Sequence, residues 1–185
     1  MDVREAIEGR RAYRSLEPAE VTDALIEDLT GVARIAPSCF NNQPWRFVFA
    51  RDKEVLERLH GALSKGNEWA TVGSMIVGVA SRLDLDCEIA GREYFLFDTG
   101  MATAFIILRA TELGLVAHPI AGFRESEAKE ALGLPEDMRL IALVIIGKHA
   151  DGIGPLLTEK QVADEAARPA RLPAAEIAFI DHYGA

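Results

Sequence analysis

Three arginines within five residues, Arg10, Arg11 and Arg14, stand out in a chain whose formal net charge is −9. Guanidinium groups bind phosphate through forked hydrogen bonds and keep their charge at every physiological pH. A second cationic stretch, Arg168-Pro169-Ala170-Arg171, lies near the C-terminus. Together the two stretches predict a phosphate site gathered from both ends of the chain. The alternative is a solvated helix end and a solvated tail.

A second candidate segment runs from Pro37 to Pro44, reads Pro-Ser-Cys-Phe-Asn-Asn-Gln-Pro, and is followed by Trp45. Its amide, hydroxyl and backbone N–H groups are suited to binding the polar edge of a flat heteroaromatic ring. The alternative is a rigid turn, closed by asparagine side chains, that places Trp45 in the core.

The third candidate segment, His118 to Phe123, is mostly apolar and contains a proline and a glycine. Its side chains offer little chemistry, so a function there would use a backbone N–H aimed at a ligand, with glycine permitting close approach. A plain connection between two elements is the simpler alternative.

Other kinds of site lack a pattern in this sequence. There is no glycine-rich phosphate loop, dinucleotide fingerprint, Gly-x-Ser-x-Gly elbow or paired acidic motif. The four histidines and the two cysteines, Cys39 and Cys87, follow no metal spacing, so we expect no bound metal and two free thiols in a reducing compartment. Any reaction must therefore be carried by a bound cofactor.

Composition narrows the class of protein further. A chain of 185 residues is the size of one domain, and its acidic charge disfavours a nucleic-acid surface. The longest apolar runs, Met75 to Ala80 and Leu140 to Ile146, are too short to cross a bilayer, and the N-terminus has no apolar signal core. We expect a cytoplasmic protein with no nucleic-acid or membrane partner.

Periodicity and stop signals locate the main elements. Helices are expected at residues 2–7, 22–36, 54–63, 97–114 and 127–132, and strands at 45–49, 75–80 and 140–146. Thr22 is a candidate N-cap, and Gly133 ends the last helix. In the longest helix, five apolar residues repeat at intervals of three and four and predict the core of the domain and of any dimer: Phe97, Met101, Ala104, Phe105 and Leu108.

These features, in this order, resemble the FMN-dependent nitroreductase family from Arg10 to Pro173. The most specific element is Pro37 to Trp45, followed by Asp98-Thr99-Gly100 near the start of a long helix and then by Pro119 to Gly122. The resemblance implies an α+β fold: a mixed, mainly antiparallel sheet wrapped by helices in three layers. It also implies an intertwined homodimer with two interface active sites, and a single FMN-binding domain over 1–185 whose residues 151–185 wrap the partner.

The family's functional positions can be carried over to matching residues of this chain. Arg10 and Arg171 are expected to hold the FMN phosphate, with Arg11 nearby. Arg14 is expected near the pyrimidine edge of the flavin, where a fixed cation stabilises the negative charge of the reduced ring.

The remaining positions match the family's ring contacts. In the family, the residues equivalent to Pro37, Ser38, Cys39 and Asn41 contact the flavin mostly from the neighbouring subunit. Asn67 matches a position that hydrogen-bonds the polar edge of the ring. The segment Pro119, Ile120, Ala121 and Gly122 is expected against the ring, with the Ala121 N–H directed at flavin N5. No side chain of the protein is expected to act as a catalytic acid or base.

The sequence departs from the family pattern at several places. Ala12 replaces a usual serine, a loss of about 1 kcal/mol of phosphate binding. Pro169 stands where some members have a cation, with Arg168 beside it as a substitute. Only Trp69 to Tyr94 occupies the place of helices that cover the site in larger members, so the site is expected to be open. Cys39 often aligns with serine, and its redox role is left open.

The implied activity is hydride transfer from NAD(P)H, through FMN, to a small acceptor such as a nitroaromatic or a quinone, by a ping-pong mechanism. Alternatives on the same scaffold are flavin or enal reduction, dehalogenation and flavin breakdown. An alternative of another class is a non-catalytic module that binds or stores FMN. The physiological acceptor and the choice of NADH or NADPH are not legible in the sequence.

Overall fold

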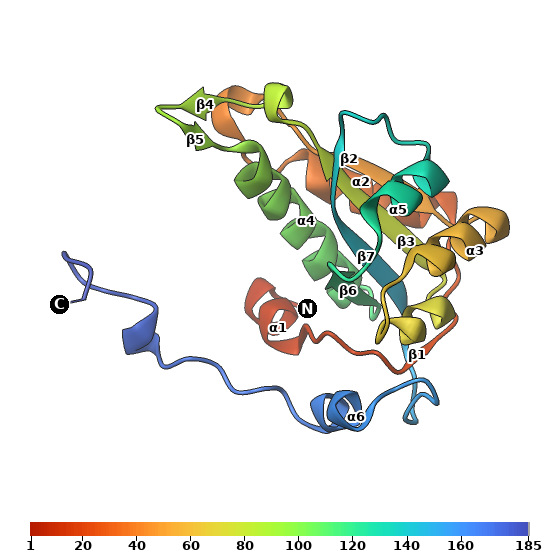
Figure 1. Cartoon of the computed structure of the whole chain (residues 1–185). Coiled ribbons are helices and arrows are strands. Elements are labelled where there is room, and N and C mark those ends of the chain that lie inside the picture. Colours follow the sequence, from red (N-terminus) through yellow and green to blue (C-terminus); the bar gives the residue numbers. More distant parts are fainter. Residues whose placement is uncertain (185) are drawn as a thin grey trace.

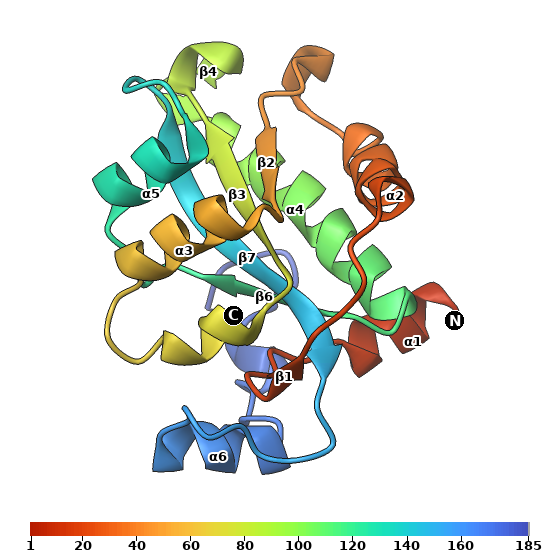
Figure 2. The same cartoon turned by 90° about the vertical axis from the view of Figure 1, so that its right-hand side faces the viewer.

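The computed structural model describes residues 1–184 as an α+β protein with helices on both faces of one sheet (Figures 1 and 2). The sheet has five strands: β2, β3 and β7 lie in that order, and β7 also pairs with β6 and with β1. Their bounds are β1 Leu16–Glu17, β2 Arg46–Ala50, β3 Met75–Ser81, β6 Val116–Ile120 and β7 Arg139–His149. All pairs within residues 1–184 are antiparallel, so the predicted sheet is confirmed without the parallel component expected of a mixed one.

The alternation of side chains along β3 explains the three layers. Met75 and Val77 belong to the core beneath helices α2, Asp23–Arg34, and α4, Phe95–Glu112. Ile76 points into the opposite core, beneath α3, Lys53–Ala62, and α5, Glu125–Leu132. A central strand that is buried on both faces must be apolar at every position, and β3 is buried throughout.

The ends of several elements follow the local signals. The Thr22 hydroxyl accepts a hydrogen bond of 3.1 Å from the Leu25 N–H at the start of α2, as predicted for an N-cap. Gly133 adopts the left-handed conformation, with φ of 63°, at the end of α5. The first helix, α1, spans Val3–Gly9 and is capped by Asp2.

The predicted apolar stripe of α4 does not enter the core of the single chain, and its place in the core of a dimer stays a prediction. Phe97, in the predicted stripe, is 64% exposed and Phe105 is 36% exposed. The face that packs on the sheet instead carries seven buried residues: Phe95, Asp98, Thr99, Ala102, Thr103, Ile106 and Ala110. Because the helix is apolar around most of its circumference, periodicity alone could not select the face that enters the core.

Two short elements were also missed. Residues 116–120 form β6, an edge strand, where Pro119 is tolerated because it pairs on one side only. Residues Glu159–Ala166 form α6, whose start carries a reciprocal cap between Thr158 and Gln161. A small hairpin pairs β4, Glu88–Ile89, with β5, Arg92–Glu93. Short 3₁₀ helices lie at Cys39–Asn41, Glu68–Val72, Leu83–Leu85 and Ala174–Glu176.

The C-terminal segment after α6 runs away from the body of the protein (Figure 1). Its apolar side chains are exposed, with Ile180 at 84% and Tyr183 at 93%. Within residues 1–184, no helix combines the length and the apolar character needed to span a membrane.

Candidate functional site

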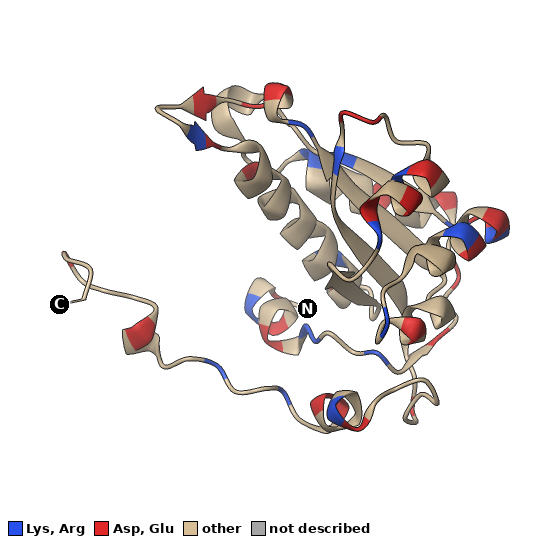
Figure 3. Cartoon of the chain, in the orientation of Figure 1, with Lys and Arg blue, Asp and Glu red and all other residues tan. Residues whose placement is uncertain are grey.

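The arginines from the two ends of the chain meet around one cavity of about 110 Å³. It is lined by Arg10, Arg11, Ala12, Arg14, Asp164, Arg168, Pro169 and Arg171. We call it the arginine pocket. In Figure 3 the segment after α1 and the segment after α6, which supply these side chains, both carry blue positions on the lower side of the molecule. The structure thus brings together the arginines of both predicted stretches: Arg10, Arg11, Arg14, Arg168 and Arg171.

Helix ends hold two of these arginines in place. Arg11 Nη2 donates to the carbonyl oxygens of Asp164 and Glu165, at 2.7 and 3.1 Å, in the last turn of α6. Arg168 Nη2 donates to the carbonyl oxygens of Glu8 and Arg10, at 2.5 and 2.9 Å, at the end of α1. A cation at a helix C-terminus is favoured by the helix dipole. Arg11 and Arg168 therefore join the two chain ends and form the frame of the pocket.

Arg10 and Arg171 are the cations left for a ligand. Among residues 1–184, neither guanidinium forms an ion pair with a carboxylate, whereas Arg14 lies 3.6 Å from Asp164. Burial lowers the pKa of Arg10, and the positive charges of Arg168 and Arg171 lower it further. Crowded cations of this kind are stabilised by an anion, and a phosphate would be one.

A buried carboxylate fixes the backbone below the pocket. Glu165 is 7% exposed and accepts hydrogen bonds from the N–H groups of Arg14 and Ser15, at 2.6 and 3.3 Å. The Gly154 N–H in turn donates to the Ser15 hydroxyl at 3.0 Å. These bonds hold residues 150–168 against residues 10–17 of the same chain, which we call the N-terminal arm.

His118 lies in β6 beneath this arm. Its ring stacks on Trp69, and its Nδ1 hydrogen-bonds the Tyr13 carbonyl at 3.0 Å. Burial lowers the pKa of His118 to about 4, and the nearby Arg14 and Arg10 charges act in the same direction. The imidazole is therefore neutral at physiological pH, with Nδ1 as the donor.

The segment predicted against a flavin ring is joined to Asn67. The Asn67 side-chain amide and the Ser64 N–H both donate to the Gly122 carbonyl, at 3.0 and 2.9 Å. A Cβ atom at Gly122 would collide with the Asn67 amide, so this approach requires glycine. Gln161 of α6 donates to the Gly66 carbonyl at 2.8 Å and so ties this region to the arginine pocket.

The segment from Ser38 to Gln43, which we call the strained loop, has an unusual backbone. Three of its non-glycine residues have positive φ: Phe40 at 48°, Asn41 at 60° and Gln43 at 52°. Each such residue costs on the order of 1 kcal/mol. The Ser38 hydroxyl accepts the Gln43 N–H at 3.0 Å, and the Asp98 carboxylate accepts the Cys39 N–H at 2.6 Å. The loop is a shaped structure, as predicted from its prolines.

The strained loop does not lie at the arginine pocket of its own chain. It contacts α4 at Asp98, near the start of the helix, whereas Arg11 and Thr111 line a common cavity near the end of the helix. The separation along α4 is about 20 Å. Pro37, Ser38, Cys39 and Asn41 are therefore grouped apart from Arg10, Arg14 and Arg171 within one chain, at opposite ends of the molecule in Figure 1.

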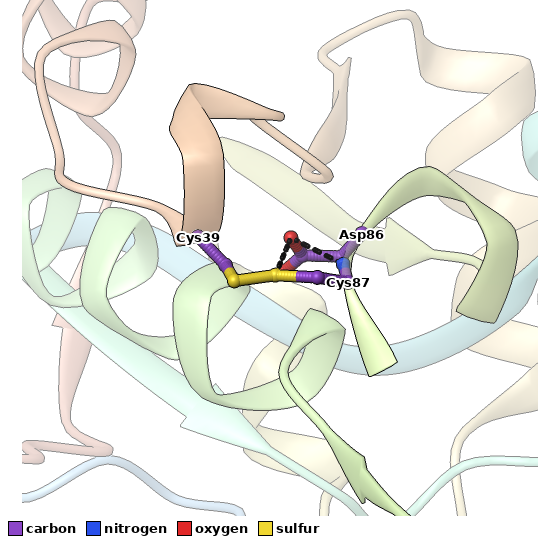
Figure 4. Close-up of side chains that lie close together, drawn as sticks. All are labelled: Cys39, Asp86 and Cys87. Carbon is purple, nitrogen blue, oxygen red and sulfur yellow. Dashed lines mark hydrogen bonds between the residues drawn. A yellow bond between two sulfur atoms is a disulfide. The ribbon is translucent and has the colours of Figure 1, made fainter. Parts of the chain in front are cut away.

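The expectation of two free thiols is wrong. Cys39 in the strained loop and Cys87, just before β4, form a disulfide with a Cα–Cα distance of 6.1 Å (Figure 4). The cysteines are 48 residues apart in sequence, so local spacing carried no signal of the contact. Asp86, between the loop and the disulfide, receives hydrogen bonds from the Cys87 N–H at 2.9 Å and the Asn42 amide at 3.3 Å.

Comparison with known proteins agrees with this arrangement. The sequence profile of the nitroreductase family matches residues 7–74 and 69–148, well over half of the chain. The chain belongs to the nitroreductase family.

Relatives and solved structures of this oxidoreductase family align over most of the chain. A "Putative NADH dehydrogenase/NAD(P)H nitroreductase" of Methanothermobacter thermautotrophicus is 30% identical over 164 residues, covering 83% of this chain and 81% of that protein. A protein of the same name from Archaeoglobus fulgidus is 29% identical over 148 residues, covering 77% and 82%. A crystal structure described as an oxidoreductase containing FMN superposes with a TM-score of 0.84 at 27% identity, covering 99% of this chain and 92% of that one.

Several residues that shape the nitroreductase site were not singled out from the sequence. Glu165 and Asp86 are polar residues whose partners are 150 and 44 residues away, so no local pattern marks them. The Thr158-x-x-Gln161 capping box, by contrast, was a readable signal for α6.

Proposed function

We propose that this nitroreductase family member is an FMN-dependent oxidoreductase that uses NAD(P)H to reduce a small acceptor, such as a nitroaromatic or a quinone, by a ping-pong mechanism. The observation that carries the proposal is the convergence of Arg10 and Arg171, two cations without carboxylate partners among residues 1–184, on one cavity. The FMN named for the structural relative supports the choice of cofactor.

The arginine pocket fits the phosphate of FMN in charge and chemistry. A phosphate dianion would relieve the repulsion that lowers the pKa of Arg10. The loss of a serine at Ala12 removes one hydrogen bond, and the Arg168 guanidinium, occupied by backbone carbonyls, is a positioning group rather than a replacement ligand. The phosphate is therefore held mainly by Arg10 and Arg171, with Arg11 behind them and Arg14 toward the ring.

The protein's own groups bind, orient and exclude water. FMN, when bound, accepts a hydride at N5 and passes two electrons on. In the proposed site, the Asn67 side chain and the segment Pro119 to Gly122 lie against the ring, and the Ala121 N–H is directed at N5. Asn67 already donates to the Gly122 carbonyl, so its amide oxygen is left to accept from the ring's polar edge. Electrostatics and position, without a catalytic acid or base, are the protein's share.

We further propose that two copies complete each site as an intertwined homodimer. The strained loop lies about 20 Å along α4 from the arginine pocket of its own chain, so Pro37, Ser38, Cys39 and Asn41 would reach the FMN of a second copy. The outward face of α4, with Phe97 and Phe105, offers the apolar surface for such contact. Since residues 150–168 bind their own chain, and Pro169 and Arg171 line its arginine pocket, residues 172–184 are left to wrap the partner.

A cytoplasmic location is part of the proposal. NAD(P)H is held inside cells, and its two electrons would be consumed there by an acceptor small enough to enter the site. The open substrate side expected from the short segment between Trp69 and Tyr94 favours a broad range of flat acceptors over one closely fitted substrate.

The test is the visible absorption spectrum of the purified protein, recorded before and after anaerobic addition of NADH and then of NADPH. Flavin bands that bleach establish the cofactor and hydride acceptance together. Bands that persist after both nucleotides indicate the non-catalytic FMN-binding module instead. A colourless protein that cannot be reconstituted with FMN would contradict the proposal as a whole.

A further inference from the structure

The Cys39–Cys87 disulfide joins the strained loop to the segment that precedes β4 (Figure 4). Both cysteines are partly exposed, so a small molecule can approach the sulfur atoms. Disulfides of proteins in reducing compartments are usually transient, and serve catalysis or redox sensing. A bond in this position is therefore a candidate for reversible opening.

The disulfide restrains the part of the chain that most needs restraint. Phe40, Asn41 and Gln43 hold conformations that L-residues avoid. Apart from the disulfide, three hydrogen bonds join the loop to other segments described in the structure: Asn42 to Asp86, the Cys39 N–H to Asp98, and the Arg46 guanidinium to the Gln43 carbonyl. The other bonds lie within the loop. Without the covalent bond, the loop would populate relaxed conformations in which the shape presented by Ser38 to Gln43 is lost.

One carboxyl group, that of Asp86, lies beside the sulfur atoms, and a second, that of Asp98, accepts the Cys39 N–H. Asp86 Oδ1 is 3.7 Å from Cys87 Sγ, and Asp86 Oδ2 is buried without a hydrogen-bond partner among the described residues. Asp98 is 2% exposed, and burial raises its pKa, as does the neighbouring Asp86 carboxyl, against the hydrogen bond from Cys39. A negative charge is disfavoured beside the buried Asp86 Oδ2, so a thiolate formed at Cys87 would readily take up a proton.

We propose that Cys39 and Cys87 form a redox-active couple that is opened by low-molecular-weight thiols, and that opening it releases the strained loop. A thiol that has lost its proton to solvent attacks the sulfur of Cys39, the S–S bond breaks, and its electron pair goes to Cys87, which takes a proton from solvent. A second thiol attacks the mixed disulfide and releases the small molecule. The protein disulfide and two thiols thus become a protein dithiol and one small disulfide, with two electrons transferred.

The consequence for the flavin rests on the proposed function. If the strained loop contacts FMN, the oxidised protein presents a preformed binding surface. In the reduced protein, ordering the loop takes up part of the free energy of FMN binding. The couple would then link cofactor affinity to the thiol status of the surroundings.

The first experiment counts thiols and does not involve FMN. The full-length protein, purified without reductant, is equilibrated in buffers of increasing reduced-to-oxidised glutathione ratio, trapped by alkylation and weighed intact. The expected result is a blocked pair in the absence of thiol, and two alkyl groups that appear together at one midpoint while the protein stays folded by circular dichroism. Cysteines that are already alkylated at the start would overturn the proposal, as would a disulfide that opens only in denaturant or a stoichiometric metal ion bound by the cysteines.

The second experiment measures FMN dissociation constants of the oxidised protein, the reduced protein and Cys87→Ser. Cys87 is outside the proposed flavin contacts, so this variant breaks the bond while leaving Cys39 in the loop. Reduction is expected to weaken FMN binding roughly tenfold, through lost preorganisation. Cys87→Ser should bind as weakly as the reduced protein and should not respond to glutathione.

Equal FMN affinity of the oxidised and reduced wild type would overturn the link between the couple and the loop. If neither state binds FMN, the proposed function fails. In that case loop release is read from limited proteolysis within residues 38–43, which should be faster for the reduced protein, and equal cleavage rates would overturn the proposal.

Discussion

The arginine pocket and the strained loop are held by different kinds of interaction. Arg11 and Arg168 frame the pocket by donating hydrogen bonds to carbonyl oxygens at helix ends. The two remaining cations, Arg10 and Arg171, can bind an anion without groups from another part of the protein. The loop is a backbone shape, held by a disulfide and by a carboxylate of α4, and it presents that shape away from its own pocket. Charge can thus be assembled from flexible side chains within one chain, whereas a shaped surface requires a rigid support.

The strongest way to break this comparison is to separate two copies. Phe97→Asp places a charge on the exposed apolar face of α4, away from the core. It is expected to make the free energy of dimer formation less favourable by more than about 3 kcal/mol. Sedimentation measures the oligomeric state, and FMN titration measures the affinity for the cofactor. The affinity for FMN should fall at least a hundredfold, while inorganic phosphate should still bind in the arginine pocket. Glu93→Gln, in the exposed β4–β5 hairpin, is the control. A monomeric Phe97→Asp that binds FMN normally would contradict a shared site.

The next prediction concerns the stability of the pocket's underside. The pKa of His118 is about 4 in the folded protein and 6.5 unfolded, so the unfolded chain binds more protons between these values. Stability should therefore fall as pH drops from 6.5 to 4, by roughly 3 kcal/mol in total. Urea unfolding of wild type and His118→Gln across this range measures the effect, and parallel pH curves for the two proteins would contradict it.

Removing one of the two arginines proposed to hold the FMN phosphate should weaken FMN binding without changing the contacts to the ring. Arg10→Ala is expected to cost about 2 kcal/mol, or roughly thirtyfold in the dissociation constant, because a charge-assisted hydrogen bond is lost. The salt dependence of binding should decrease as well. Arg4→Ala, in the same helical region but paired with Glu8 at the surface, is the matched control. Equal losses for both variants would mean that only net charge matters.

The smallest expected effect sharpens the ring side. Gly122→Ala forces the Asn67 amide to move and should weaken FMN binding by about 1 kcal/mol, close to fivefold. Gly61→Ala in α3, where an added Cβ meets open space, should instead stabilise the protein slightly. Flavin fluorescence titrations of the two variants test this contrast. An unchanged affinity in Gly122→Ala would remove Asn67 from the site.

The features predicted correctly from the sequence depend on residues close together in the chain, whereas the features that were missed depend on residues far apart. Caps, glycine stops and apolar strands act over a few residues, and Thr22, Gly133 and β3 followed them. The face of α4 and the Cys39–Cys87 bond depend on contacts between distant segments, and there the reasoning from pattern failed. The sequence predicted one site with arginines from both ends of the chain, and the structure brings these arginines together.

Strand β7 pairs with both β6 and β1, and β1 is the short strand that leads from the segment of Arg10, Arg11 and Arg14 into the body of the protein. Leu16 pairs with His149, so this contact spans most of the chain and can form only after β7 has been made. On the ribosome, the N-terminal arm must therefore wait for the last quarter of the protein. The arginine pocket also takes Arg168 and Arg171 from beyond β7, so a ligand that needs all of these cations can bind only after residues 168–171 have been made.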